Sequence, residues 1–249
     1  MSGHSKWAGI KHKKALLDAK KSKAFTKVIR EITQAARLGG GNPDANPNLR
    51  LAIQKAREVN MPSDNVERAI KRGTGELPGI SYETIVYEGY GPNGVALMIE
   101  ALTDNRNRAT AELRNILTKN GGNLAGAGST SWIFQRKGYF IVGKEGVDED
   151  QLMSVALDSG AEDVSTGDAA FEIITAPHDF EKVRTALQQA KFTLQSADLT
   201  MIPSSTVKLD GDPARKILAL MDMIEDHDDV QHVYANFDVP DSILTEAQK

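Results

Sequence analysis

Apolar residues recur at helical spacing through the first third of the chain. The clearest stripe is Phe25, Val28, Ile29, Ile32 and Ala36, and it ends at three glycines, residues 39–41. A second segment begins at Asn46-Pro47, a capping residue followed by proline. A third begins at Asp64, with Glu67 three residues later as a capping box. We therefore predict a bundle of three helices over residues 1–78.

The apolar period changes from helical to alternating after Glu83. Two alternating runs, 83–90 and 95–103, flank a Gly-Pro-Asn-Gly turn and predict a β-hairpin. A helix capped by Asp104 should follow and stop at Gly121-Gly122. Residues 135–203 then read as β-α-β-β-α-β, the order of a ferredoxin-like unit.

The last part of the chain supplies the second helix and the further strand that the hairpin segment lacks. A helix capped by Asp212 and a strand over VQHVYANF complete its pattern, and that strand should close the chain. We predict an α+β, multidomain protein: a helical bundle at 1–78, a discontinuous α/β domain at 79–134 plus 204–240, and a ferredoxin-like domain at 135–203 inserted into it.

Charge divides the chain along the same boundary. The whole chain has a net charge of -4. Residues 1–79 carry sixteen basic and seven acidic side chains, a net +9, whereas the other 170 residues carry fourteen basic and twenty-seven acidic ones, a net -13. Nine of the basic residues lie in the first thirty positions beside a single acid, Asp18. Such a split indicates domains with different partners.

The basic opening is typical of a segment that binds phosphate backbones, because cations displace the counterions condensed on a nucleic acid. An aromatic residue among them can stack on an unpaired base. The alternative is a solvated helix face with the tryptophan packed as a hydrophobic staple. The predicted nucleic-acid-binding residues are Lys6, Trp7, Lys11, His12, Lys13 and Lys14, supported by Lys20, Lys21, Lys23 and Lys27.

A second candidate contact lies at a predicted helix start, where backbone N–H groups attract anions. Asn105, Arg106, Asn107 and Arg108 can hold a phosphate or meet a protein partner there, although capping explains the asparagine equally well. The glycine-rich stretch 121–129 lacks the Lys-Ser/Thr ending of a phosphate-binding loop.

Other functional classes find little support. The chain has no cysteine, so thiol catalysis and thiolate metal sites are excluded. Residues 225–229 with His232 offer metal-ligand side chains without a metal-site spacing, and we interpret them as an acidic turn. His4, His12 and His178 have no nucleophile motif beside them. We expect no enzyme activity, metal, cofactor, small-molecule substrate or membrane partner, and a cytoplasmic location.

Several motifs together resemble the YebC family, which includes mitochondrial translational activators of cytochrome oxidase. They are GHSKWAGIKHKK, NPNLRLAIQKAREVNMPSDNVERAIKRG, YEGYGPNGVA, TDNRNR and GGNLAGAGS. Gly9 stands where the family usually has asparagine, and glycine has no side chain to make any hydrogen bond that the family makes from that position. The resemblance implies a helical bundle followed by two α/β domains, the third inserted in the second.

The resemblance also implies a role in gene expression. Family members are described as DNA-binding transcriptional regulators or as ribosome-associated translation factors that bind ribosomal RNA and relieve stalling. The sequence shows no clear helix-turn-helix recognition helix, which weakens the hypothesis of a factor that binds duplex DNA. A tryptophan among lysines suits the alternative hypothesis, binding to folded RNA. A protein-interaction adaptor is the third reading, in which the lysines only solubilise the chain.

Overall fold

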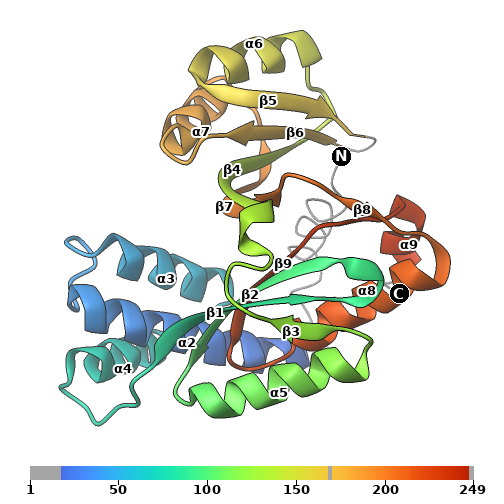
Figure 1. Ribbon diagram of the computed structural model, residues 1–249. Coiled ribbons are helices and arrows are strands. Elements are labelled where there is room, and N and C mark those ends of the chain that lie inside the picture. Colours follow the sequence, from blue (N-terminus) through green and yellow to red (C-terminus); the bar gives the residue numbers. More distant parts are fainter. Residues whose placement is uncertain (1–17, 168–169, 247–249) are drawn as a thin grey trace. The chain divides into compact units, whose positions relative to one another are not determined.

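The structure, a computed structural model, describes residues 18–167 and 170–246 (Figure 1). These residues form two compact units. One holds residues 18–129 and 211–233, and the other holds residues 130–210 and 234–246. The combination of helices with mostly antiparallel sheets confirms the α+β, multidomain fold class.

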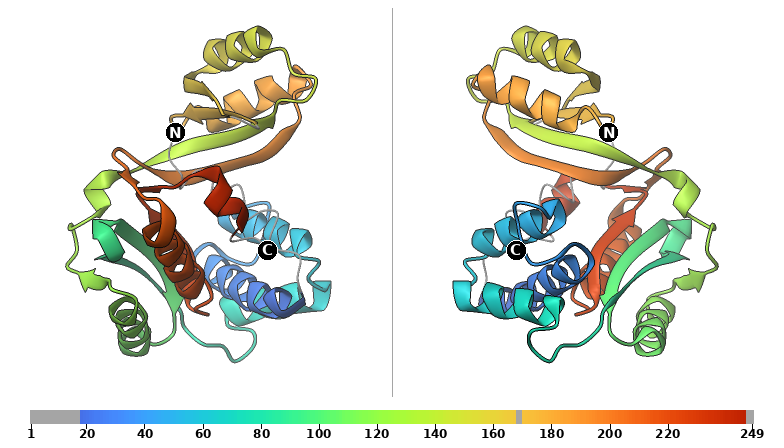
Figure 2. Two further views of the ribbon diagram at one scale, coloured as in Figure 1. Left: turned by 90° about the vertical axis from the view of Figure 1, so that its right-hand side faces the viewer. Right: turned by 90° about the vertical axis from the view of Figure 1, so that its left-hand side faces the viewer.

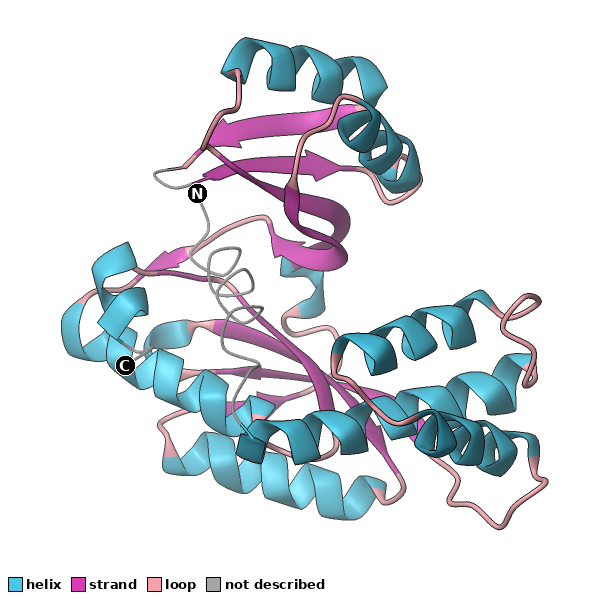
Figure 3. Cartoon of the chain, turned by 180° about the vertical axis from the view of Figure 1, so that it is seen from behind, coloured by secondary structure: helices cyan, strands magenta, loops and turns pink. Residues whose placement is uncertain are grey.

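The first unit begins with the predicted bundle: α2 (Asp18–Gly39), α3 (Pro47–Glu58) and α4 (Ser63–Thr74). Its core consists of the predicted stripe on α2 together with apolar residues of the other two helices, among them the fully buried Leu49. Asn46 caps α3 as predicted, since its side chain accepts a hydrogen bond from the Leu49 N–H. The helices can be followed from behind in Figure 3.

The sheet of the first unit has the strand order β3-β1-β2-β9. The predicted hairpin is β1 (Glu83–Tyr90) and β2 (Ala96–Thr103), joined through the short helix η1 (Pro92–Gly94). β3 (Asn123–Ala125) lies on the other side of β1, and β9 (Val230–Ala235) lies next to β2. Gly89 allows the close approach of β3, because a Cβ there would lie 2.6 Å from the Asn123 carbonyl oxygen.

Two longer helices accompany this sheet, α5 (Arg106–Lys119) and α8 (Gly211–Glu225), and they contact each other. Each buries an apolar stripe, with Leu113 and Leu117 on α5 and Ile217, Leu220 and Met221 on α8 all fully buried. Helices α5 and α8 therefore share a hydrophobic contact, and this brings residues from either side of positions 130–210 into one structure.

The second unit contains the predicted β-α-β-β-α-β segment, seen from the side in Figure 2. Its elements are β4 (Phe134–Gly143), α6 (Glu149–Ser159), β5 (Ala161–Thr166), β6 (Ala170–Thr175), α7 (Phe180–Gln189) and β7 (Leu194–Pro203). The strand order is β5-β6-β4-β7. The apolar core between α6, α7 and the sheet is built entirely from residues 140–197. The same unit holds η2 (Ser131–Ile133), the parallel pair β8 (Val207–Lys208) and β10 (Phe237–Asp238), and α9 (Asp241–Glu246).

Some predicted ends of elements are wrong. Asp64 does not cap α4: Pro62 occupies the N-cap, and its carbonyl accepts hydrogen bonds from the N–H groups of Asn65 and Val66. Asp104 does not cap α5 either, because its carboxylate pairs with Arg108 and Asn105 takes the N-cap. Asp212 lies in the first turn of α8, one residue after the helix begins. The strand that should have closed the chain is followed by α9.

Candidate nucleic-acid interface and the acidic turn

Most of the predicted nucleic-acid-binding residues lie outside the described residues. These are Lys6, Trp7, Lys11, His12, Lys13 and Lys14. Lys20 and Lys21 belong to α2, but the described side chains of this helix begin at residue 23. Of the predicted set, the structure therefore places the side chains of Lys23 and Lys27.

Lys23 and Lys27 both contact the end of α8. The Lys23 ammonium lies 3.2 Å from the Asp226 carboxylate and donates to the Asp226 carbonyl at 3.2 Å. The Lys27 ammonium donates to the Glu225 carbonyl at 2.6 Å. Carbonyls at the end of a helix carry partial negative charge and have no partner within the helix, so they attract cations.

Arg30 continues this set one turn further along α2. Its guanidinium donates to the Asp228 carbonyl at 2.8 Å and forms an ion pair with the Asp229 carboxylate. The same group lies over the ring of Tyr82, 5.5 Å from the centroid, in a cation–π contact. Arg30 is only 13% exposed. Sequence reasoning counted Arg30 in the basic stretch but omitted it from the predicted site.

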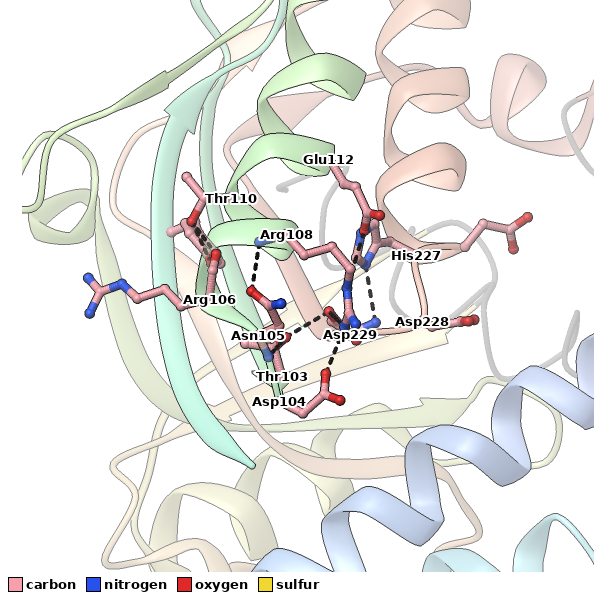
Figure 4. A network of polar contacts seen from close by, with 12 residues as sticks. Thr103, Asp104, Asn105, Arg106, Arg108, Thr110, Glu112, His227, Asp228 and Asp229 are labelled. Carbon is pink, nitrogen blue, oxygen red and sulfur yellow. Dashed lines mark hydrogen bonds and ion pairs between the residues drawn. The ribbon is translucent and has the colours of Figure 1, made fainter. Parts of the chain in front are cut away.

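Asp229 is the buried centre of a polar network (Figure 4). Its side chain is 2% exposed, and its second carboxylate oxygen accepts hydrogen bonds from Arg108 and from the Thr103 hydroxyl, each at 2.8 Å. Arg108 also reaches the Asp104 carboxylate at 2.8 Å. One carboxylate thus joins two arginines from different parts of the chain, Arg30 on α2 and Arg108 on α5.

The protonation of this network follows from its contacts. Burial by itself would raise the pKa of Asp229, but hydrogen bonds from Arg108, Thr103 and Arg30 outweigh it and lower the pKa below its usual value. The hydrogen bond to Asp229 raises the pKa of Arg108, against the opposing effect of burial. Asp229 is therefore a carboxylate, and Arg108 a cation, throughout the physiological range.

The second candidate contact, at the start of α5, divides into structural and exposed residues. The Asn105 side chain accepts a hydrogen bond from the Arg108 N–H and caps the helix. The guanidinium of Arg108 pairs with the carboxylates of the exposed Asp104 and the buried Asp229 (Figure 4). Arg106 and Asn107 are exposed, and Figure 4 shows Arg106 pointing away from the network. Capping and ion pairing thus account for Asn105 and Arg108.

His227 lies beside the network and contacts α5. Its Nδ1 accepts a hydrogen bond from the Asp229 N–H at 3.1 Å, and its Nε2 lies 2.8 Å from the Glu112 carboxylate. An accepting Nδ1 leaves the ring proton on Nε2, which donates to Glu112. Sequence reasoning missed Glu112, because it lies 115 positions away from His227.

Ligand atoms of Glu112, His227 and Asp229 lie within 4.8 Å of one another, a spacing that a metal ion can use. The surrounding charges oppose one, because both oxygens of Asp229 already accept hydrogen bonds from arginines. An ion would also have to displace the proton on His227 Nε2. The chemistry of this donor set therefore favours an ion-pair network over a metal centre.

A cleft of about 420 Å³ opens beside the network. Its lining combines Lys23, Arg30 and Arg108 with Glu112 and residues 226–229. Small-molecule sites are usually lined by apolar and aromatic side chains with a few polar groups. This cleft is bordered by paired charges, so its chemistry is that of an electrostatic contact between elements.

The remaining motif residues of the hairpin stabilise the glycine-rich loop. The Glu88 carboxylate, on β1, accepts a hydrogen bond from the Gly128 N–H at 2.8 Å, and the Tyr90 hydroxyl donates to the Ser129 carbonyl at 3.0 Å. Glu88 is buried. These contacts give the YEGYGP and GGNLAGAGS motifs a structural role.

None of the helices within the described residues has the length and apolar character that crossing a membrane would need.

Comparison with known proteins agrees with the resemblance seen in the motifs. Residues 5–76 match the family model described as the TACO1/YebC protein N-terminal domain, and residues 82–237 match the model for the TACO1/YebC second and third domain. A probable transcriptional regulatory protein from Dictyoglomus turgidum is 57% identical over 98% of each chain. One from Halothermothrix orenii is also 57% identical, over 99% of this chain and 98% of its own.

A solved structure has the same fold. The crystal structure of a conserved hypothetical protein from Aquifex aeolicus superimposes with a TM-score of 0.78 at 48% sequence identity. The match covers 93% of this chain and 96% of that one.

Proposed function

Because the chain belongs to the TACO1/YebC family, we propose that it is a non-enzymatic regulator of gene expression that binds nucleic acid through its N-terminal bundle. Its curated relatives are named as probable transcriptional regulatory proteins, which supports a role in transcription. We propose DNA as its ligand and a cytoplasmic location. The names describe those proteins, and the residues of this chain supply the physical argument.

The division of charge carries the proposal. Residues 1–79 have a net charge of +9 and the rest of the chain -13. The part of the bundle whose side chains are described, residues 23–78, has ten basic and six acidic residues, a net charge of +4. A nucleic acid is attracted to the bundle and repelled by the acidic remainder, which orients the encounter.

The described surface of the bundle offers cations beyond the basic opening. Arg68, Lys71 and Arg72 are exposed on α4, and the last two lie three and four positions after Arg68, one turn along the helix. The two arginines on α3, Arg50 and Arg57, are exposed as well. These side chains are able to extend a phosphate-binding surface that starts in residues 6–27.

A salt titration tests the proposed surface. If five cations of the basic opening meet phosphates of duplex DNA, log Kd should change with log salt with a slope of about 4 to 5 in magnitude. Neutralising Lys6, Lys11, Lys13 and Lys14 to Gln should reduce that magnitude by about 3 to 4. The matched control neutralises Lys119, Lys182, Lys208 and Lys216, which are exposed outside the bundle. Equal slopes for both variants would contradict the proposal.

Crosslinking in living cells distinguishes the two nucleic acids. A DNA-binding transcriptional regulator should recover promoter fragments, whereas a ribosome-associated translation factor should recover ribosomal RNA clustered at one site, recognised by its shape. Recovery of protein partners without either nucleic acid would favour the adaptor role.

A further inference from the structure

Three cations on one face of α2 all contact a single acidic turn. Lys23, Lys27 and Arg30 are spaced four and three positions apart and therefore share a face of the helix. Each of them has a partner within residues 225–229, the end of α8 and the turn that follows it. The basic and acidic segments are separated by about two hundred positions in the sequence.

The acidic turn presents its oxygens much as a phosphate backbone does. The carbonyl oxygens of Glu225, Asp226 and Asp228 and the carboxylates of Asp226 and Asp229 all accept from the α2 cations. The negative end of the α8 dipole adds to this field. Carbonyl and carboxylate oxygens along a cationic helix face resemble the arrangement that the phosphates of a bound nucleic acid would create.

From these contacts we infer that the acidic turn, residues 225–229, is an autoinhibitory element that competes with nucleic-acid phosphates for the basic face of α2. Lys23, Lys27 and Arg30 are occupied while the turn is docked. A nucleic acid gains them only when the turn and α2 separate. The inference rests on the proposed function, since it names a regulation of the same phosphate-binding surface.

The packing of the first unit is compatible with such a separation. The hydrophobic cluster of the bundle contains residues of α2, α3, α4 and their connections alone, so the bundle retains that core when α2 leaves the turn. Residues 75–81, between α4 and β1, are all exposed and include two glycines and a proline.

The strength of the contacts is graded along the helix. Lys23 and Asp226 are 44% and 62% exposed, so their ion pair is weak and screened by salt. Arg30 and Asp229 are almost fully buried and hold more tightly. The outer contact can therefore open first and release Lys23, while Arg30 remains in place until a ligand competes for it.

Charge neutralisation in the full-length chain is the first test. Asp226→Asn with Asp228→Asn removes two exposed negative charges from the turn, one of them paired with Lys23, and spares the buried Asp229. The control, Glu145→Gln with Asp163→Asn, removes the same charge from exposed positions of the other unit. The probes are a labelled mixed-sequence DNA duplex and a labelled RNA hairpin of equal phosphate number. We expect a rise in affinity of about 2- to 5-fold for the turn variant, and less for the control.

A reversible crosslink between α2 and the acidic turn is the second test. The chain has no cysteine, so Lys23→Cys with Asp226→Cys can be joined selectively by a short bismaleimide that contains a reducible disulfide. The locked form should bind the probes at least about 5-fold more weakly than the same protein after reduction. Comparing one variant in two states removes any effect of the lost lysine or of altered folding.

The outcomes separate the two proposals. Equal affinities of the locked and reduced forms, with binding abolished by neutralising Lys6, Lys11, Lys13 and Lys14, would overturn the autoinhibitory role and leave the proposed function standing. Absence of binding to both probes in the native chain and in every variant would overturn both. A response with only the duplex or only the RNA identifies which phosphate backbone the turn imitates.

Discussion

At the scale of single residues, Asp229 has the most consequential environment. It lies at the boundary between α8 and β9, is 2% exposed and joins Arg30 to Arg108. Because charged groups are costly to bury without partners, the carboxylate and the two guanidinium groups depend on one another. Thr103 completes the arrangement through its hydroxyl.

Replacing Asp229 with Asn should destabilise the protein by about 3 kcal/mol, because the largely buried Arg30 and the more exposed Arg108 lose their shared anion. Urea unfolding followed by circular dichroism measures this loss. The control is Asp104→Asn, which removes a more exposed partner of Arg108 and should cost about 1 kcal/mol or less. Equal losses in the two variants would show that burial of Asp229 adds nothing.

The lowered pKa of Asp229 also predicts a pH dependence. Between the lowered folded pKa and the usual pKa of 3.8, the Asp229 carboxyl is deprotonated in the folded chain but protonated in the unfolded chain. Its contribution to the free energy of unfolding is therefore complete at pH values above 3.8. The contribution is lost as the pH falls through the lower folded pKa. Unfolding midpoints measured from neutral pH into this acidic range should fall more steeply for the native chain than for Asp229→Asn. Parallel curves would contradict the assignment.

At the scale of elements, Asn46 fixes the geometry between α2 and α3. Its side-chain oxygen caps α3, and its amide nitrogen donates to the carbonyls of Ala35 and Gly40 at 2.8 and 2.9 Å. The residue is buried, and a Cβ on Gly39 would lie 2.7 Å from its Nδ2. One side chain thus joins the end of one helix to the start of the next.

An Asn→Asp substitution at two helix starts distinguishes the capping role of an asparagine from the role of Asn46 in joining two helices. Asn46→Asp keeps the capping oxygen but places a carboxylate against two carbonyls, and it should cost about 2 kcal/mol or more. Asn105→Asp should change stability by less than about 0.5 kcal/mol, because Asn105 is exposed and aspartate caps equally well. Thermal or urea unfolding of both variants makes the comparison, and an equal effect at both positions would mean that the donor bonds of Asn46 are unimportant.

At the scale of the whole molecule, the ferredoxin-like segment has the features of an insertion. Ser204 donates from its backbone N–H to the Ile133 carbonyl at 2.8 Å, and from its hydroxyl to the same oxygen at 3.0 Å. The chain therefore leaves and re-enters this segment at one place. All residues of its hydrophobic cluster lie between positions 140 and 197. We propose, on these grounds, the discontinuous domain at 79–134 plus 204–240 and the inserted domain at 135–203.

This proposal predicts that residues 133–204 fold when expressed alone, because their core needs no other segment and their ends are adjacent. The measurements are circular dichroism and a cooperative unfolding transition. The reciprocal variant joins residues 1–132 to 205–249 through a short glycine linker, and it should retain the Arg30–Asp229–Arg108 network. A non-cooperative fragment would show that the segment depends on the rest of the chain.

The sequence alone predicted the order and type of most elements, since apolar periodicity and turn residues act locally. It located the bundle, the hairpin and the β-α-β-β-α-β segment, and its motifs identified the family that the comparisons confirmed. It misplaced Asp64, Asp104 and Asp212, because several polar residues near a helix start compete to cap it and backbone geometry selects among them.

Only the tertiary structure decided which charges meet. Residues 225–229 look like a solvated acidic turn in the sequence, and Arg30 looks like one more cation in a basic stretch. Folding brings α2, α5 and the end of α8 together, so that Asp229 lies between Arg30 and Arg108 and the turn contacts Lys23, Lys27 and Arg30 of α2. Long-range ion pairs leave no periodic signal, because a charged side chain has the same local preferences whether it faces water or a partner two hundred residues away.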